Sequence, residues 1–306
     1  MNKYIITLFC VLGQLAQGKV LIFTYAFNRP DFIEVQHNTL EALLEDEYEL
    51  VVFSDAKSKG NAQSIKDTCE RLGIKHIPIP QDIHKRAYLE RWPGERLDAP
   101  AVRNVNAVMY SLYNYGFDHD DILVLFDSDL FLIKPLSFRK ILQDYDIAAM
   151  QIGNGYVTYL WHGLCCLNMK TLPNIRTLNF NCGKIDGKPI DAGGHSYFYL
   201  RDNPDIKVHF FNYFHTVHFR CPSCATNDSL ICNHNLDLLQ SKGFDNIMID
   251  FLQNAHNVEC FHDASFLHYR GGTNWNHRTA GYHQRKTAAF KKLIAHALST
   301  GQKKHT

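Results

Sequence analysis

The chain lacks an excess of charge of either sign. Its 306 residues include 32 lysines and arginines against 31 aspartates and glutamates, for a formal net charge of +1. Nucleic-acid-binding proteins normally carry a basic excess, so this balance argues against nucleic acid as a partner. Internal repeats, low-complexity segments and an obvious linker are also missing. With 45% hydrophobic residues the composition is globular, and residues 19–306 are predicted to form one domain.

Long apolar runs are equally scarce. After residue 18, no stretch is long and apolar enough for a membrane helix. The N-terminus has Lys3, an apolar run over residues 4–12 and the small residues of Ala16-Gln17-Gly18. This pattern predicts a cleavable signal peptide over residues 1–18 and an exported or lumenal protein. The alternative is an uncleaved N-terminal strand, helix or short anchor, and a chain without a signal would be cytoplasmic.

The nine cysteines allow two interpretations. Removal of the expected signal leaves eight, and an even number in an exported chain is compatible with disulfides. Cys221, Cys224, Cys232 and His234 also have the spacing of a zinc knuckle. The oxidising compartment that a signal implies favours disulfides, and neither interpretation implies catalysis.

The first half of the chain alternates apolar runs with amphipathic stretches. Apolar runs at 20–26, 48–53 and 75–79 are separated by stretches with helical periodicity that begin near residues 31 and 62. This β-α-β-α-β order predicts a parallel sheet with right-handed crossovers. The second half is less regular, and its last predicted strand covers residues 261–269.

The most informative stretch is 122–136, with the sequence ILVLFDSDLFLIKPL. A continuous apolar run predicts a strand buried on both faces, and open α/β sheets bind ligands at the carboxyl ends of such strands. Here that end carries Asp127, Ser128 and Asp129. Two carboxylates one residue apart can reach one Mg²⁺ or Mn²⁺ ion, which prefer oxygen ligands. A polar turn is the alternative. The apolar flanks favour the metal, because burying two uncompensated carboxylates is costly.

The Asp127-Ser128-Asp129 segment resembles the DxD signature of GT-A glycosyltransferases. In that family the two acids hold the metal that bridges the diphosphate of a nucleotide sugar. The resemblance implies a GT-A-like α/β fold, with a mostly parallel central sheet flanked by helices. It also implies a metal-dependent, hexosyltransferase-type enzyme that moves a sugar from a nucleotide-diphosphate sugar to a carbohydrate, protein or lipid acceptor. Asp127 and Ser128 would face the donor. Asp127 and, more directly, Asp129 would hold Mn²⁺ or Mg²⁺ as a Lewis acid.

A second element carries the same resemblance. The stretch 266–275, FLHYRGGTNW, places His268 between a strand and a glycine-containing loop that reaches Trp275. Imidazole is a good ligand for Mn²⁺, and glycine allows backbone to approach phosphate closely. The stretch is similar to the C-terminal His-x-x-Gly…Trp element of metal-dependent GT-A transferases, in which the histidine completes the metal site. The Lys-Pro pair of the glycogenin-like group is missing before the Trp, which leaves phosphate neutralisation to Arg270 or Arg278.

Residues near two further strand ends are implied to meet the nucleotide. Thr24 and Tyr25 lie near the end of the first apolar run, and Asp55 follows the second. By the resemblance, these three residues contact the nucleoside, and Arg103 on the helix before the DSD strand meets the donor. The alternatives are ordinary strand-end chemistry and, for Arg103, a solvent-facing position on a helix.

By the same resemblance, residues 19–151 form the nucleotide-sugar-binding half and residues 152–306 the acceptor side. The apolar run at 159–169 resembles the strand that follows DxD. The loop that begins at Asp191 lies where an acid binds sugar or acceptor, or acts as the general base of inverting enzymes. A glycine-rich turn with an Asp cap is the alternative for this loop. The implied catalytic residue is Asp191, and the implied substrate-contacting residues are Trp161, Asn168, Gly193, Gly194 and His195.

Two other functions fit a fold of this kind. A sugar-nucleotide nucleotidyltransferase would carry a glycine-rich, basic loop after its first strand, but residues 27–30, FNRP, contain no glycine. A non-catalytic secreted binding protein could keep the fold while its aspartates serve only as turn caps, because fold alone does not determine function.

Overall fold

The computed structural model describes residues 18–85, 100–153, 157–215, 239–241, 244–254, 258–273 and 280–301. Residues 1–17 of the expected signal peptide lie outside these ranges. The choice between zinc and disulfides for Cys221, Cys224 and Cys232 also falls outside them, as do Trp275 and Arg278. Within the described part, no helix is long and apolar enough to cross a membrane. The cysteines of this part are all buried, namely Cys69, Cys165, Cys166, Cys182 and Cys260.

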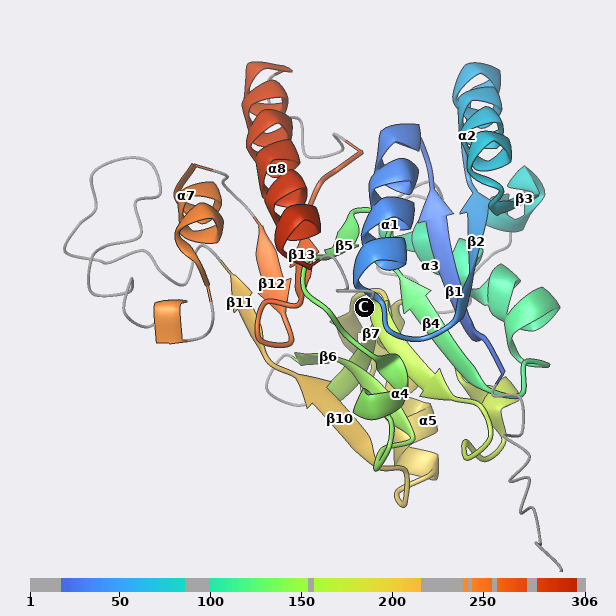
Figure 1. The fold of residues 1–306 in the computed structure, drawn as a ribbon. Helices are drawn as coiled ribbons and strands as arrows, with labels where there is room; N and C mark the ends of the chain where they lie inside the picture. The colour runs from blue at the N-terminus through green and yellow to red at the C-terminus, as the bar shows by residue number, and fades with distance from the viewer. Residues whose placement is uncertain are drawn as a thin grey trace, which may run out of the picture.

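Alternating strands and helices form the first part of the chain (Figure 1). Strands β1 (Val20–Ala26), β2 (Tyr48–Ser54) and β3 (Lys75–Pro78) alternate with helices α1 (Pro30–Leu43) and α2 (Lys59–Leu72). Helix α1 begins at a proline, whose missing N–H costs nothing in a first turn. The Ser58 side chain accepts the Asn61 N–H at the start of α2, and Gly73 ends this helix at a φ of 67°.

The central sheet has seven strands in the order β10-β6-β7-β4-β1-β2-β3. Strand β4 (Ile122–Phe126) pairs parallel with β1, and beyond it lie β7 (Thr158–Asn168), β6 (Ile147–Gly153) and β10 (Val208–Phe211). Strand β7 runs antiparallel to both β4 and β6, whereas β1–β2, β2–β3 and β6–β10 are parallel pairs. This arrangement confirms the predicted α/β fold with a mostly parallel central sheet.

Both faces of the sheet are covered, as the continuous apolar runs predicted. Phe23 and Tyr25 of β1 pack in one core cluster with residues of helix α3 (Pro100–Ser111). Ile22 packs on the opposite face, in a cluster with Leu40 and Leu43 of α1. Because successive side chains of a strand point to opposite faces, each apolar position of β1 has a layer to pack against.

A second sheet of four antiparallel strands, ordered β11-β12-β13-β5, joins distant parts of the chain. Its strands are β5 (Leu130–Leu132), β11 (Tyr213–His215), β12 (Glu259–Phe261) and β13 (Phe266–His268). The single strand predicted over residues 261–269 is therefore wrong. The chain turns between β12 and β13 through three residues with left-handed φ, namely His262, Asp263 and Ala264.

Helix α8 (Ala280–Gly301) covers the second sheet and lies beside α1, as Figure 1 shows. Phe290 and Leu293 of α8 pack in one cluster with Phe131 and Leu267 of the sheet, and with residues of α7 (Asn246–Asn254). The remaining elements are short: η1 (Gln81–Lys85), η2 (Leu112–Gly116), α4 (Phe138–Ile141), η3 (Ile175–Thr177), β8 (Gly183–Ile185), β9 (Lys188–Ile190) and α5 (Ser196–Asp202).

Candidate metal site between the two sheets

The DSD segment forms the turn between β4 and β5, and so lies where the two sheets meet. The Ser128 N–H donates to Asp127 Oδ1 at 2.7 Å, and the Leu130 N–H donates to the Asp127 carbonyl at 3.1 Å. The Asp127 N–H donates to the Gly163 carbonyl of β7 at 2.8 Å. The turn is thus fixed by its own side chain and by the neighbouring strand.

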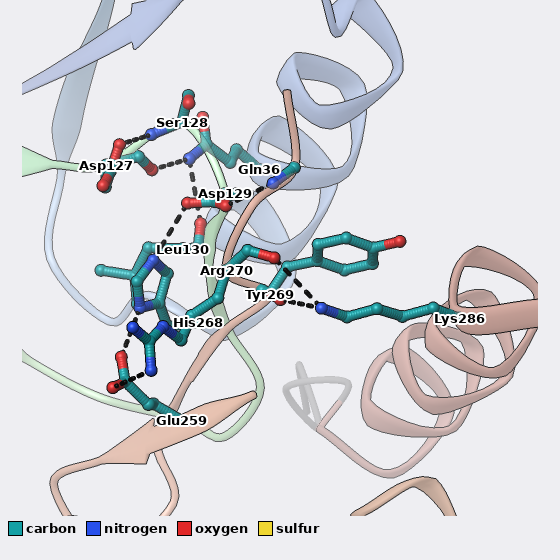
Figure 2. Close-up of polar contacts among 11 residues, drawn as sticks. Gln36, Asp127, Ser128, Asp129, Leu130, Glu259, His268, Tyr269, Arg270 and Lys286 are labelled. Carbon is teal, nitrogen blue, oxygen red and sulfur yellow. Dashed lines mark hydrogen bonds and ion pairs between the residues drawn. The ribbon is translucent and has the colours of Figure 1, made fainter. Parts of the chain in front are cut away.

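A buried glutamine that the sequence analysis missed holds this turn from α1. Gln36 donates through Nε2 to the carbonyls of Asp127, at 2.7 Å, and Leu130, at 2.9 Å (Figure 2). Its Oε1 accepts the Thr24 hydroxyl at 3.0 Å. The available signal was a polar residue on the apolar face of a helix, because Gln36 is buried together with Phe32, Ile33 and Leu40.

Asp129 is the most engaged residue of the turn. Its Oδ1 lies 3.1 Å from His268 Nε2, and its Oδ2 accepts the Gly272 N–H at 2.9 Å. Its backbone carbonyl accepts the Tyr269 N–H at 2.8 Å. The register explains this proximity, since β13 pairs antiparallel with β5 and places His268 opposite Leu130, the residue after Asp129.

A carboxylate behind His268 orients its ring. Glu259 Oε2, on the adjacent strand β12, lies 2.7 Å from His268 Nδ1, and Glu259 Oε1 lies 3.1 Å from an Arg270 guanidinium nitrogen. The Trp161 ring packs against the His268 ring with 5.0 Å between centroids. A carboxylate that accepts from Nδ1 fixes the ring so that Nε2 faces the site, which is the usual second-shell arrangement of metal-binding histidines, and a metal would bind Nε2 after displacing its proton.

Electrostatics differ sharply between the two aspartates. Burial, followed by the neighbouring Asp129 carboxylate, raises the pKa of Asp127 to about 6. Burial also opposes ionisation of Asp129, but the charge and hydrogen bond of His268 outweigh it and hold the pKa of Asp129 below its usual range. Burial would lower the pKa of His268, yet Asp129 and Glu259 outweigh it and raise this pKa to about 10.

The chemistry of the donor set fits a hard divalent cation. One ligand atom each from Asp127, Asp129 and His268 lies within 4.8 Å of the others, and among the described residues only these three form such a group. Carboxylate oxygens with one imidazole nitrogen suit Mn²⁺ well and Mg²⁺ acceptably. Asp127 is partly buried, whereas Asp129 and His268 are buried.

Asp55 and Arg103, predicted to meet the nucleotide, form a second buried cluster at the end of β2. Arg103 lies 2.6 Å from Asp55 Oδ1, and His84 Nε2 lies 2.7 Å from the same oxygen. Gln81 Nε2 donates to Asp55 Oδ1 at 3.1 Å. His84 and Gln81, both on η1, were not singled out from the sequence, where neither stands in a recognisable motif.

Thr24 and Tyr25 are turned inward. The Thr24 hydroxyl donates to Gln36, and the Tyr25 hydroxyl lies 2.8 Å from Ser111 Oγ on α3, with the Tyr25 ring stacked on Phe53. Both residues are buried. The Thr24 side chain therefore braces the DSD turn and the Tyr25 side chain braces α3, and the expected contact of these residues with a nucleotide stays a prediction.

The residues expected to contact substrate fall into two groups. Trp161 lies against His268, and the loop of Gly193 packs on Leu160, directly before Trp161. Gly193 has a φ of 93°, and a Cβ at this position would collide with the Leu160 carbonyl. Asn168 lies at the opposite end of β7, paired with Ile122, so the prediction that it lines the sugar site is wrong.

The remaining loop residues stay near the Trp161 end of β7. Asp191 is exposed, and its Oδ1 accepts the Ala192 N–H at 2.8 Å, which is the turn-cap role named as the alternative. Gly194 is buried against Ile190, and the His195 N–H donates to the Asn181 carbonyl at 3.0 Å. Among the described contacts, none joins Asp191 to the Asp127–Asp129–His268 group, so its catalytic role stays a prediction.

Comparison with known proteins gives structural likeness only. No protein-family model matches the chain, and no curated protein matches it. A structure of an active-site mutant of LgtC matches at 14% identity over 89% of this chain and 96% of that chain, with a TM-score of 0.42. Galactosyltransferase LgtC with donor and acceptor sugar analogues matches at 15% identity, with a TM-score of 0.35, over 61% of this chain and 66% of that one.

A third similar structure is glucosyl-3-phosphoglycerate synthase from Mycobacterium tuberculosis with Mn²⁺, UDP and glucosyl-3-phosphoglycerate. It matches at 16% identity over 63% of this chain and 68% of that chain, with a TM-score of 0.39. The chain thus spans about two thirds of two of these structures. With TM-scores this low, the functional conclusions below depend on the side chains of the site alone.

Proposed function

We propose that this chain is a metal-dependent glycosyltransferase that transfers a sugar from a nucleotide-diphosphate sugar. The observation that carries the proposal is the convergence of Asp127, Asp129 and His268 between the two sheets. Asp129 and His268 come together although 139 positions separate them in the chain. A turn cap would not require this convergence, because the hydrogen bond from the Ser128 N–H to Asp127 Oδ1 already caps the turn.

The residues of the site would have three roles: binding the metal, positioning its ligands and supporting the nucleoside. Asp127, Asp129 and His268 would hold Mn²⁺ or Mg²⁺, which supplies Lewis-acid stabilisation of the charge that develops on a leaving nucleoside diphosphate. Glu259 keeps His268 Nε2 directed at the site, and Gln36 keeps the turn in place. Asp55 and Arg103 lie at the carboxyl end of β2, on the same edge of the parallel sheet, where they would support the nucleoside.

The finer assignments belong to the same proposal. Asp191 would serve as general base toward an acceptor hydroxyl in an inverting transfer, and Trp161 with the Gly193–His195 loop would border the sugar. The transferred group would be a hexose and the acceptor a carbohydrate, protein or lipid. In assays of a donor that turns over, D191N should lower kcat at least about hundredfold while the KM for the donor changes little. Retained kcat would remove Asp191 from this role.

Export is proposed from residues 1–18 alone. In a host with a secretory pathway, the mature chain is expected to begin at Lys19, and intact-mass measurement of the secreted protein tests this. A chain recovered inside the cell that still begins at Met1 would contradict it.

The metal proposal is tested by calorimetric titration of Mn²⁺, and then of UDP and GDP in its presence. D129N is expected to weaken Mn²⁺ binding at least about hundredfold, because it removes the charge of the central ligand. D120N is the matched control, since Asp120 is exposed just before β4, at the opposite end of the same strand. Equal Mn²⁺ binding by the wild-type chain, D129N and D120N would contradict the proposal.

A further inference from the structure

The loop after β13 is wrapped around Asp129. Arg270 and Gly271 both have left-handed φ, of 54° and 68°, so the chain reverses directly after Tyr269. The reversal brings the Gly272 N–H to Asp129 Oδ2, and a Cβ at Gly272 would press on Asp129 and Phe32. The hydrogen bond to Asp129 therefore depends on the backbone conformation of the residues before Gly272. One of them, Arg270, is a non-glycine residue with a left-handed φ, which is a strained conformation.

A buried lysine on α8 holds that conformation. Lys286 is 2% exposed, and its Nζ donates to the carbonyl of Tyr269 and, at 3.1 Å, to the carbonyl of Arg270 (Figure 2). The same ammonium lies 4.1 Å from the centroid of the Tyr269 ring. Burying an ammonium is costly unless its N–H groups find acceptors, and the two carbonyls supply them.

The two carbonyls belong to the residues that follow His268 directly. Tyr269 lies between the histidine and the reversal, with its N–H on the Asp129 carbonyl and its own carbonyl on Lys286. Its hydroxyl lies 3.0 Å from Thr287 Oγ1, also on α8. The Phe290 ring of α8 packs on the Tyr269 ring with 5.4 Å between centroids. Among these described contacts between α8 and the loop, those of Lys286 are the ones made to backbone carbonyls.

We propose that Lys286 is a positioning residue of the metal site. Its ammonium locks the Tyr269–Gly272 backbone in the one conformation that presents His268 Nε2 and the Gly272 N–H to Asp129 together. The inference deepens the proposed function of the same site and rests on it. Lys286 itself touches neither metal nor substrate in this account.

The experiment compares Mn²⁺ affinity, measured calorimetrically on the purified chain, for the wild type, K286M and T287V. K286M keeps the length of the side chain but removes its charge and donors, and should weaken Mn²⁺ binding at least about tenfold. T287V removes the side-chain hydrogen bond between α8 and the Tyr269 hydroxyl, and should stay within about threefold of the wild type. Hydrogen exchange of the Gly272 amide should speed up in K286M and stay slow in T287V.

Each outcome decides the matter. A folded K286M with wild-type Mn²⁺ affinity overturns the inference, as does a loss of affinity in T287V equal to that in K286M. If K286M does not fold, K286Q replaces it, because its amide keeps N–H donors but no charge. An intermediate loss of affinity supports the inference, and wild-type affinity overturns it. A wild-type chain that does not bind Mn²⁺ at all overturns the proposed function, and the role of Lys286 with it.

Discussion

Asp55 follows strand β2 and Asp127 follows strand β4, and both strands pair with β1. The protein compensates the charges of these two carboxylates to different degrees. Asp55 receives a guanidinium, an imidazole and an amide from Arg103, His84 and Gln81. Asp127, in contrast, receives within the described residues only the N–H of Ser128, and it stands beside a second aspartate. The first cluster is complete by itself, whereas the second contains a carboxylate whose charge the protein leaves poorly compensated. The contrast separates an acid that the protein neutralises by itself from one whose charge is left for a bound cation to compensate.

Removal of Arg103 should have the largest effect of the substitutions considered. R103M leaves the buried Asp55 carboxylate without its cation, and breaking a buried ion pair in this way typically costs about 3–5 kcal/mol. Urea unfolding would measure the loss. Mn²⁺ affinity should remain within about threefold, because Arg103 makes no contact with the DSD turn among its described partners.

The matched control for R103M is K140M. Lys140 forms a 2.6 Å ion pair with Glu45, but it is exposed, so its removal should leave the unfolding midpoint unchanged within error. If R103M were as stable as K140M, the Asp55 carboxylate would not depend on Arg103 for compensation, and the comparison between the two clusters would fail.

Neutralising Asp127 should do the opposite and stabilise the metal-free protein. Its folded pKa of about 6 lies above the unfolded value of 3.8, so the folded state binds more protons between these values, and stability falls as pH rises through them. D127N removes this penalty. It should add roughly 1–3 kcal/mol at pH 7, and the gain should vanish below about pH 4.

Unfolding of the metal-free proteins at pH 7 and pH 4 measures this effect, and D127N should at the same time lose Mn²⁺ binding. D118N, at an exposed residue before β4, is the control and should show no gain. A destabilised D127N at pH 7 would mean that Asp127 is a structural cap after all.

The smallest expected effect comes from the support behind His268. E259Q removes the carboxylate that faces Nδ1, and second-shell substitutions of this kind weaken metal affinity by about 10–100-fold, of which we expect the lower end. Calorimetric titration with Mn²⁺ measures the change, with E49Q, at an exposed residue near the start of β2, as the control. Unchanged affinity in E259Q would show that the ring is held by Trp161 and the loop alone.

The parallel half of the fold was predictable because its signals are local. Continuous apolar runs mark β1, β2 and β4, and Ser58 and Gly73 bound α2 in the way that helix ends prefer. The hairpin between β12 and β13 carries no such signal, because residues with side chains adopt left-handed φ there without a glycine. The sequence therefore suggested one strand where the structure has two.

The sequence singled out the three candidate ligands but not the residues that support them. Asp127 and Asp129 stood out because polar residues interrupt a strongly apolar stretch, and His268 because a glycine loop follows it. Gln36 and Glu259 are single polar residues, and only the tertiary fold shows what they hold. Asn168 was misplaced because the direction of β7 relative to β4 cannot be read from its apolar pattern.

The central claim is that one divalent cation binds between Asp127, Asp129 and His268. Anomalous scattering at the manganese edge, from crystals of the wild-type chain grown with Mn²⁺ and UDP, tests it most directly. The account predicts a strong peak within about 2.0–2.4 Å of a ligand atom from Asp129 and of His268 Nε2. A peak elsewhere with none at this site, or clear UDP density without a metal, would contradict it.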